Sequence, residues 1–253
     1  MVKLKYMTSV LLLILCWELI SRLGVVPNTL LPPFSDVVRL YTNPNFAQTL
    51  LTNYAISLMR SLMGFTIGLV AGISLAVILS FKSIHEFIHP IATLFFAVPS
   101  VAWIPLLIVW VGVDELKLPL LSAFLCTFPP ILYGMMNTLR TMDKEQVDVA
   151  LVLGAKPSAV LARIIIPQAI LRIIPQIKVE AIMSWKTVFV TEMVALSSGL
   201  GYLALIYATS IDMERLLSVI ILFTLSVLII VELFDHIEKA LSSKWLGEET
   251  WYR

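Results

Sequence analysis

The stretch DKEQVDVALVLGAKPSAVLARIIIPQAILRIIP, residues 143–175, is the longest amphipathic interruption in a chain that is otherwise strongly apolar. Its pattern predicts two short helices separated near Gly154, because glycine is favoured just after the end of a helix. Pro157 follows, and proline is favoured at the first position of the next helix. A structured, basic loop in a hydrophobic protein is typical of a surface that contacts a soluble partner. The stretch therefore predicts a loop of fixed shape with a docking role.

The composition of the whole chain is that of a membrane protein. Of its 253 residues, 59% are hydrophobic and 14% are charged, and the mean hydropathy is +0.93. Soluble domains are about half apolar and about a quarter charged. We therefore expect an integral membrane protein with one domain spanning residues 1–253. No dense basic patch with interleaved aromatic residues occurs, so nucleic acid is not an expected partner.

Six apolar segments reach or approach the length of about 20 residues that a helix needs to cross a bilayer. They are residues 7–23, 56–80, 88–111, 118–139, 177–196 and 216–234. Hydrocarbon cannot satisfy exposed backbone groups, so each segment should form a helix. The sequence thus predicts an all-α polytopic membrane protein with about six transmembrane helices.

The distribution of Lys and Arg predicts the orientation, because these residues concentrate on the cytoplasmic side of a membrane. With six spans, both termini lie on one side, which collects Lys3, Lys5, Lys82, Arg140, Lys144, Lys156, Arg163, Arg172, Lys178, Lys239, Lys244 and Arg253. The opposite side has only Arg22, Arg39, Lys117 and Arg215. We therefore expect both termini and the 143–175 loop to be cytoplasmic.

The first outer loop, residues 24–55, is long enough to carry structure of its own. The run LPPFSD at 31–36 predicts a turn followed by a helix whose N-cap is Ser35 or Asp36. We expect a short interfacial helix through Tyr41, lying along the outer membrane surface.

The second span carries Gly64, Gly68 and Gly72 at intervals of four residues, which places them on one helical face. Small residues at this spacing allow close helix approach by van der Waals packing. We expect packing within the helix bundle, and a subunit interface is the alternative.

The third span contains Pro99 and Pro105. Proline leaves carbonyl groups without a hydrogen bond and kinks a helix, which membrane helices tolerate beside cavities or neighbouring helices. Two interpretations remain open: a moving wall of a transport pathway, and a static bend.

Two charged residues lie within the fifth span. A lysine in hydrocarbon costs at least about 2.5–3.5 kcal/mol, so Lys186 should face a cavity or a partner. Glu192 lies roughly 120° around the helix from it, so the two are not an i,i+4 pair. Lys186 therefore contacts either an anionic substrate or an acid or backbone carbonyl of another helix. We expect Glu192 to hydrogen-bond the turn at 197–201, with substrate contact as the alternative.

The run His85-Glu86-Phe87-Ile88-His89 matches H-E-x-x-H, the zinc-binding motif of metalloproteases. Pro90 follows at once and places the motif at a helix boundary. The only other histidine in the chain is His236, so an obvious third ligand is missing. We expect a polar turn and no bound metal, and an intramembrane zinc protease is kept as an alternative function.

No G-x-x-x-x-G-K-[ST] phosphate loop occurs in the chain, so nucleotide-driven transport would need another polypeptide. One motif points to such a partner. Asp148-Val149-Ala150, Gly154, a gap of nine residues and Ile164-Ile165-Ile166-Pro167 resemble E-A-A-x-x-x-G-x(9)-I-x-L-P, the EAA motif of binding-protein-dependent ABC importer permeases. Asp148 stands for Glu, Val149 for Ala and Ile166 for Leu. Residues 57–65, 98–112 and 197–203 resemble further parts of the same family.

The resemblance covers nearly the whole chain and is closest to the nitrate, sulfonate, taurine and bicarbonate branch. It implies the type I ABC importer permease fold, in the prokaryotic plasma (inner) membrane, with residues 143–175 as the cytoplasmic coupling loop. Two copies, expected as a homodimer, would surround a central pathway. An extracytoplasmic substrate-binding protein would deliver the solute, and two ATPase subunits would bind ATP and Mg²⁺. This chain would then need no cofactor and catalyse no reaction.

The residues and the resemblance together define the expected sites. Val147, Ala150, Leu151 and Gly154 fall on one apolar face that fits a groove, and Asp148, Ala155, Ile164 and Pro167 complete the ATPase-coupling set. The alternative for this helix is a position on the lipid surface. Lys186, Pro99, Pro105 and Glu192 are the expected pathway residues. The expected function is alternating-access import of a small, anionic solute, and an ion-coupled secondary carrier is a further alternative.

Overall fold

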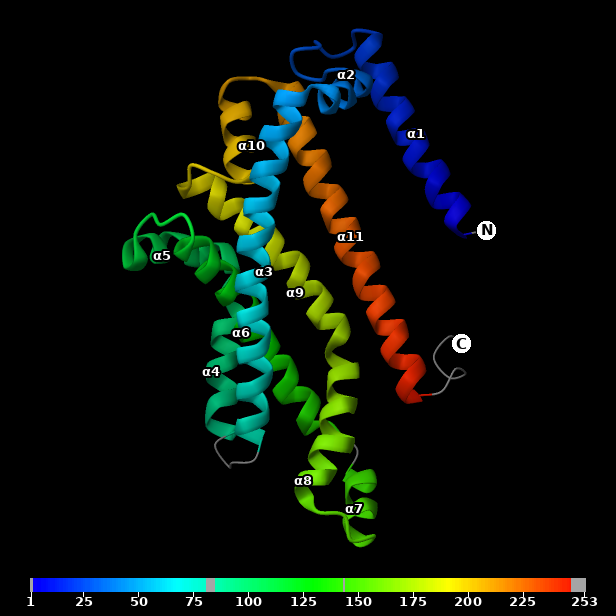
Figure 1. Cartoon of the computed structure of the whole chain (residues 1–253), viewed down its shortest axis with the longest axis vertical. Coiled ribbons are helices and arrows are strands. Elements are labelled where there is room, and N and C mark those ends of the chain that lie inside the picture. Colours follow the sequence, from blue (N-terminus) through cyan, green and yellow to red (C-terminus); the bar gives the residue numbers. More distant parts are fainter. Residues whose placement is uncertain (1, 81–84, 143, 247–253) are drawn as a thin grey trace.

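In the computed structural model, which describes residues 2–80, 85–142 and 144–246, all regular elements are helices. Four of them are long and apolar enough to cross a bilayer: α3 (Pro44–Ser80), α6 (Lys117–Arg140), α9 (Ile166–Ala195) and α11 (Met213–Leu246). Figure 1 shows these helices running along the long axis of the molecule, with short helices at both ends. The predicted all-α membrane architecture is confirmed.

The predicted third span is divided into two arms. α4 (His85–Ala97) and α5 (Trp103–Val111) are joined through the short helix η2 (Ser100–Ala102), and the chain bends by 83° at this break. Pro99 precedes η2 with an extended ψ of 132°, which ends the helical path. Counting the bent pair as one span and adding α1 (Val2–Arg22) gives about the predicted number of six.

The outer loop differs from the prediction in two details. The helix α2 (Phe34–Arg39) has Pro33 at its N-cap position, so the predicted N-cap at Ser35 or Asp36 is wrong. The Ser35 hydroxyl is engaged elsewhere, donating to Glu18 Oε1 at 2.9 Å. The loop also ends before residue 55, because α3 begins at Pro44, where a proline at the first helical position costs no hydrogen bond.

The short helices α2 and η1 (Leu40–Thr42) cross the N-terminal end of α11, as Figure 1 shows. The Tyr41 hydroxyl donates to the backbone oxygen of Ser218 at 2.7 Å, and the Ser218 hydroxyl donates to the backbone oxygen of Val37 at 3.3 Å. Val37 is fully buried. These bonds hold α2 and η1 against α11.

The glycine face of α3 packs against α6 of the same chain. A Cβ added at Gly68 would lie 2.9 Å from the Cβ of Thr127, and one at Gly72 would lie 2.9 Å from Ile131 Cγ2. A Cβ added at Gly64 would come closer still, to the Cβ of Ala123. The absence of side chains on this face lets the two helices approach closely, and it makes α3 and α6 the centre of the bundle.

The 143–175 stretch forms α7 (Lys144–Val152), α8 (Pro157–Val160) and the π-helical turn η3 (Leu161–Ile165), which continues directly into α9. The second predicted helix is therefore not a separate short element. Pro167 lies in the first turn of α9, and the helix runs on to Ala195. Figure 1 shows α7 and α8 projecting from the end of the bundle opposite to α2 and α10 (Leu200–Thr209).

Candidate functional site

The break between α7 and α8 has a defined hydrogen-bond pattern. Gly154 has a φ of +86°, and its N–H donates to Leu151 O at 2.9 Å. The N–H of Ala155 donates to Ala150 O at 3.0 Å. This pair of bonds is the Schellman arrangement, which favours glycine at the left-handed position. Pro157 then begins α8, as the sequence predicts.

The end of α7 presents apolar side chains to the surroundings. Val152 is 86% exposed and Leu153 is 82% exposed, and Val149 is also exposed. Within the predicted docking face, Leu151 is exposed, whereas Val147 and Ala150 are half-buried. The exposed apolar surface of α7 therefore includes Val149, Val152 and Leu153, which lie beside the predicted face. We call Val149, Leu151, Val152 and Leu153 the α7 apolar surface.

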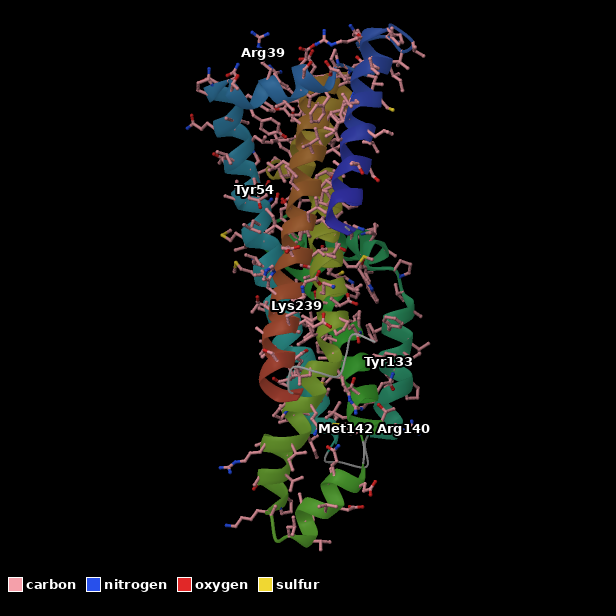
Figure 2. The ribbon with its side chains drawn as sticks, turned by 90° about the vertical axis from the view of Figure 1, so that its right-hand side faces the viewer. Arg39, Tyr54, Tyr133, Arg140, Met142 and Lys239 are labelled. Atoms are coloured by element: carbon pink, nitrogen blue, oxygen red, sulfur yellow. The ribbon has the colours of Figure 1, made fainter. Side chains whose placement is uncertain are left out.

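The remaining predicted coupling residues lie around this surface. Asp148 is exposed on α7, whereas Ala155, Ile164 and Pro167 are half-buried. Gln168 Nε2 donates to Gln146 Oε1 at 2.8 Å and so ties α9 to α7. Figure 2 shows Arg140 and Met142, the residues that lead into α7, at the opposite end of the molecule from Arg39.

A second group of polar residues joins four segments near the other end of the bundle. Arg60 of α3 is only 3% exposed. Its Nη1 donates to Glu192 Oε1 at 2.9 Å and to the Ser198 backbone oxygen at 2.9 Å. Its Nη2 donates to Glu115 Oε2 at 2.5 Å and to Ser198 Oγ at 2.7 Å. We call Ser57, Arg60, Glu115, Glu192, Ser197 and Ser198 the outer polar cluster.

Glu192 is fully buried at the end of α9 and receives several donors. Ser57 Oγ lies 2.7 Å from its Oε2, and the Gly201 N–H donates to the same oxygen at 3.1 Å. The contact with Gly201 places Glu192 against the turn at 197–201. Gly199 in this turn has a φ of +106°, and a Cβ there would overlap the Glu192 carboxylate. Glu192 thus supports the turn and does not line a described cavity.

Glu115 lies in the loop between α5 and α6 and completes the cluster. Burial raises the pKa of Glu115, but hydrogen bonds from the Ser197 and Ser198 side chains, from the Ser197 N–H and from Arg60 outweigh it and lower that pKa from 4.5 to about 2. Ser197 N lies 2.9 Å from Glu115 Oε1. The carboxylate therefore connects the broken third span to the turn after α9.

Two adjoining cavities lie between α4, α6 and α9. One has a volume of about 630 Å³ and the other about 160 Å³, and both are lined by Phe96 and Glu180. Pro99 and Ser100 line the smaller one, so the break in the third span borders it. Ser100 Oγ lies 3.0 Å from Thr187 Oγ1, which fixes the break against α9. We call these two cavities the α9 cavity.

The other predicted pathway residues lie apart from one another. Lys186 is exposed on α9, and none of the described residues forms an ion pair with it. It shares the open face of α9 with Val179 and Met183, which line the α9 cavity. Pro105 is exposed on α5 and lines neither part of that cavity. Pro99 is thus the one predicted pathway residue that lines it.

The H-E-x-x-H motif begins α4, which starts at His85. The side chains of His85, Glu86 and His89 lie outside the described part of the structure. Among the residues whose side chains are described, no group of three or more His, Cys, Asp and Glu is arranged to hold a metal ion.

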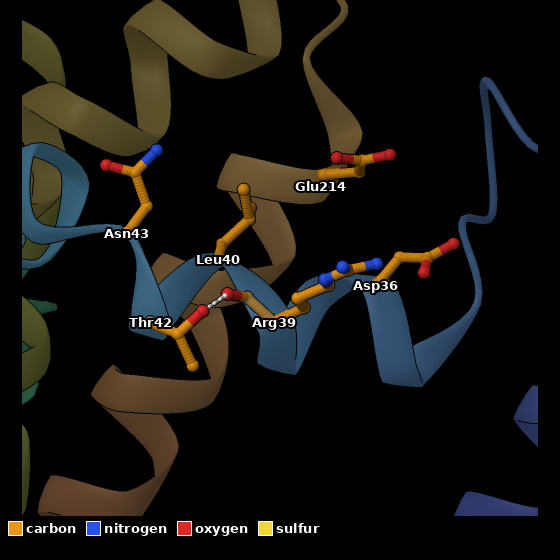
Figure 3. Close-up of a pocket in the computed structure, with 6 residues that line it drawn as sticks. All are labelled: Asp36, Arg39, Leu40, Thr42, Asn43 and Glu214. Carbon is orange, nitrogen blue, oxygen red and sulfur yellow. Dashed lines mark hydrogen bonds between the residues drawn. The ribbon is translucent and has the colours of Figure 1, made fainter.

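A shallow pocket of about 380 Å³ lies where η1 meets the start of α11 (Figure 3). Its charged lining residues are Asp36, Arg39 and Glu214. Thr42 Oγ1 donates to the Arg39 backbone oxygen at 2.7 Å and closes the turn beneath it. This pocket lies at the end opposite to α7.

Sequence reasoning missed three charged residues of the outer polar cluster and the α9 cavity. Arg60 lies within a predicted span, and a charged residue in a span usually faces the bundle interior and pairs with another group. Glu180 lies in the fifth predicted span and carried the same signal. Glu115 had no signal of its own, because its role depends on a bend of 83° that brings the loop after α5 onto the 197–201 turn.

The family profile and the relatives that match this chain are all transport permeases. The family profile of the binding-protein-dependent transport system inner membrane component matches residues 68–245. The "Putative aliphatic sulfonates transport permease protein SsuC" of Bacillus subtilis (strain 168) is 31% identical over 192 residues, which cover 76% of this chain and 69% of that protein. The taurine transport system permease protein TauC of Escherichia coli (strain K12) is 24% identical over 197 residues, covering 76% of this chain and 71% of that protein.

Solved structures share the fold. An amino acid ABC transporter crystallised with histidines superposes with a TM-score of 0.66 at 16% identity, covering 79% of this chain and 98% of the other. The MetNI methionine ABC transporter in an inward-facing conformation gives a TM-score of 0.61 at 18% identity, covering 78% and 95%. The permease architecture is therefore common to these chains.

Proposed function

This chain belongs to the family of binding-protein-dependent transport system inner membrane components, and we propose that it is the membrane-spanning subunit of an ATP-driven importer. It is a permease of the sulfonate and taurine type, and the chemistry of ATP hydrolysis resides on a separate ATPase. Two copies form the pathway, most simply as a homodimer. An extracytoplasmic binding protein supplies the solute.

The single observation that carries the proposal is the α7 apolar surface. Val152 and Leu153 are more than four-fifths exposed at the tip of a projecting helix. Exposed apolar residues on an amphipathic helix favour insertion into a groove of a partner. The alternative, a helix resting on lipid, is disfavoured because the exposed charges at Glu145 and Asp148 are acidic, whereas helices that lie on a membrane are typically rich in Lys and Arg on their polar face.

The path from this surface into the membrane is continuous. α8 and η3 run directly into α9, and α9 carries both Glu180 of the α9 cavity and Glu192 of the outer polar cluster. Because a helix transmits displacement along its axis, movement of α7 by an ATPase shifts one wall of the cavity. Alternating access then exposes the solute to each side in turn.

The distribution of Lys and Arg supports a cytoplasmic position for both termini and for α7. The solute class is that of the relatives named above, small molecules bearing a sulfonate, with nitrate and bicarbonate as the other anions of the same branch. The exposed Lys186 suits such an anion.

A reconstituted system tests the proposal. Proteoliposomes should contain this chain and its ABC ATPase, with the binding protein outside, and uptake of labelled 2-aminoethanesulfonate and of nitrate is measured with and without ATP. The variant carrying Val152→Asp and Leu153→Asp should lose ATPase binding and uptake, because charge is inserted into an apolar contact. Val25→Asp makes a similar change at an exposed valine of the outer loop and should leave ATPase binding intact.

The outcomes separate the candidate functions. Uptake that persists without ATP or without the ATPase would support an ion-coupled carrier and overturn the proposal. Stoichiometric zinc together with peptide hydrolysis would support the intramembrane protease. Normal uptake by the α7 double variant would remove the coupling role of this helix.

A further inference from the structure

Glu180 is the buried carboxylate of the bundle that has no partner among the described residues. It lies at the middle of α9 and is only 7% exposed. No described residue donates a hydrogen bond to it or forms an ion pair with it, whereas Glu192 on the same helix receives donors from Ser57, Arg60 and Gly201. A buried carboxylate without donors is unfavourable, so the position of Glu180 calls for a donor from outside the chain.

The carboxylate borders open space. Glu180 lines both parts of the α9 cavity, and the larger part, about 630 Å³, is large enough for a small solute. Among the described residues that line the two parts, none is Lys or Arg. The only formal charge in the lining is therefore negative, which favours a cation or a strong hydrogen-bond donor.

Aromatic side chains complete the lining. Phe96 and Tyr133 stack with their ring centroids 5.3 Å apart, and both line the larger part of the cavity. Tyr133 lies beside α4 in Figure 2. Gln176 Nε2 donates to the Pro130 backbone oxygen at 2.7 Å and is thereby held in the cavity wall. A carboxylate next to aromatic rings is the combination that recognises ammonium groups.

We propose that Glu180 receives the ammonium group of the transported solute in the α9 cavity, so that the substrate class is small amines, including aminosulfonates. This inference rests on the proposed function as a permease. Lys186 lies six residues further along α9, roughly 9 Å by the helical rise, on the exposed face of that helix. Lys186 does not line the cavity itself, but it lies on the same face of α9 as Val179 and Met183, which do. The ammonium group of a zwitterion thus meets Glu180 inside the cavity, and its acidic group extends along this face toward Lys186.

Ligand binding to the purified permease–ATPase complex, without binding protein, tests the inference directly. The two probes are 2-aminoethanesulfonate and 2-hydroxyethanesulfonate, which share the chain and the sulfonate and differ in the ammonium group. We expect the wild-type complex to bind the amine at least about tenfold more tightly, because only the amine brings a charged hydrogen-bond donor to the buried carboxylate. Glu180→Gln should remove this preference and leave binding of the hydroxyl probe unchanged.

Matched variants distinguish the roles of the two charges. Lys186→Met should weaken both probes alike and preserve the preference for the amine, because it removes a contact with the sulfonate. Equal binding of the two probes by the wild-type complex would overturn the inference, as would a preference that survives Glu180→Gln. If the Glu180→Gln variant fails to assemble, the ratio of the two affinities in the wild-type complex tests the inference by itself. ATP-driven uptake, measured in the same preparation, tests the proposed function. A complex that transports with ATP but binds the two probes equally would overturn this inference and leave the proposed function intact.

Discussion

Replacing Arg60 by methionine tests whether the outer polar cluster holds the outer end of the bundle together. The side chain is 3% exposed, and Glu192, its acidic partner, is fully buried. Methionine retains an unbranched apolar stem but leaves the Glu192 carboxylate without a counter-charge. Removing one partner of a buried ion pair costs about 3–5 kcal/mol. The contact of Arg60 with Glu115 adds little, because Glu115 is 46% exposed and such pairs contribute about 0–1 kcal/mol.

The assay is the free energy of unfolding in mixed micelles, followed by tryptophan fluorescence. We expect Arg60→Met to lose about 3–5 kcal/mol, whereas Glu115→Gln, the matched control at the exposed end of the same cluster, should lose about 1 kcal/mol or less. Adding Glu192→Gln to Arg60→Met should recover at least about 1 kcal/mol, since the uncompensated buried charge is then absent. An Arg60→Met variant no less stable than Glu115→Gln would refute the reasoning, as would a double variant that recovers nothing.

Three further predictions address other parts of the molecule. Gly68→Ala should destabilise the chain by about 1–3 kcal/mol in the same unfolding assay, because its Cβ would lie 2.9 Å from that of Thr127; an unaffected stability, like that expected for the exposed Thr66→Ala, would count against close packing of α3 on α6. The pKa of Glu115 is about 2 and not 4.5, so its stabilisation is present above pH 4.5 and declines as the pH falls toward 2; the stability difference between wild type and Glu115→Gln should therefore shrink below pH 4.5, and a constant difference would be inconsistent with the hydrogen bonds to Ser197 and Ser198. Gly154→Val should uncouple ATP hydrolysis from uptake in proteoliposomes, because valine is strained at a φ of +86°; normal coupling, as expected for the exposed control Ala162→Val, would show that the break has no role.

Local patterns predicted the helices and the break at Gly154 because their causes are local. Apolar runs of membrane-spanning length define the long helices, and glycine with a following proline defines the end of α7 and the start of α8. The same reasoning misplaced the start of α2. Serine is a residue type favoured at the N-cap, but the Ser35 hydroxyl donates a hydrogen bond to Glu18 of the preceding helix. Sequence spacing does not reveal this contact.

The site residues that escaped prediction depend on contacts between distant segments. Arg60 and Glu115 meet because the third span bends by 83°, and a proline predicts a bend without predicting its size. The predicted docking face of α7 was chosen from the helical period alone. That period groups residues on one face of the helix but does not reveal which face packs against the rest of the chain. Glu180 was overlooked in favour of Lys186, although its burial against a cavity distinguishes it.

A photo-reactive amino acid at Val152, incorporated in intact membranes that contain the assembled transporter, reports most directly on how this chain is driven. Val152 is 86% exposed at the tip of α7. We expect the probe there to cross-link to the ABC ATPase, and the same probe at Val25 of the outer loop to leave the ATPase unlabelled. Cross-links from Val152 to lipid alone, with transport still dependent on ATP, would contradict docking of the ATPase on α7.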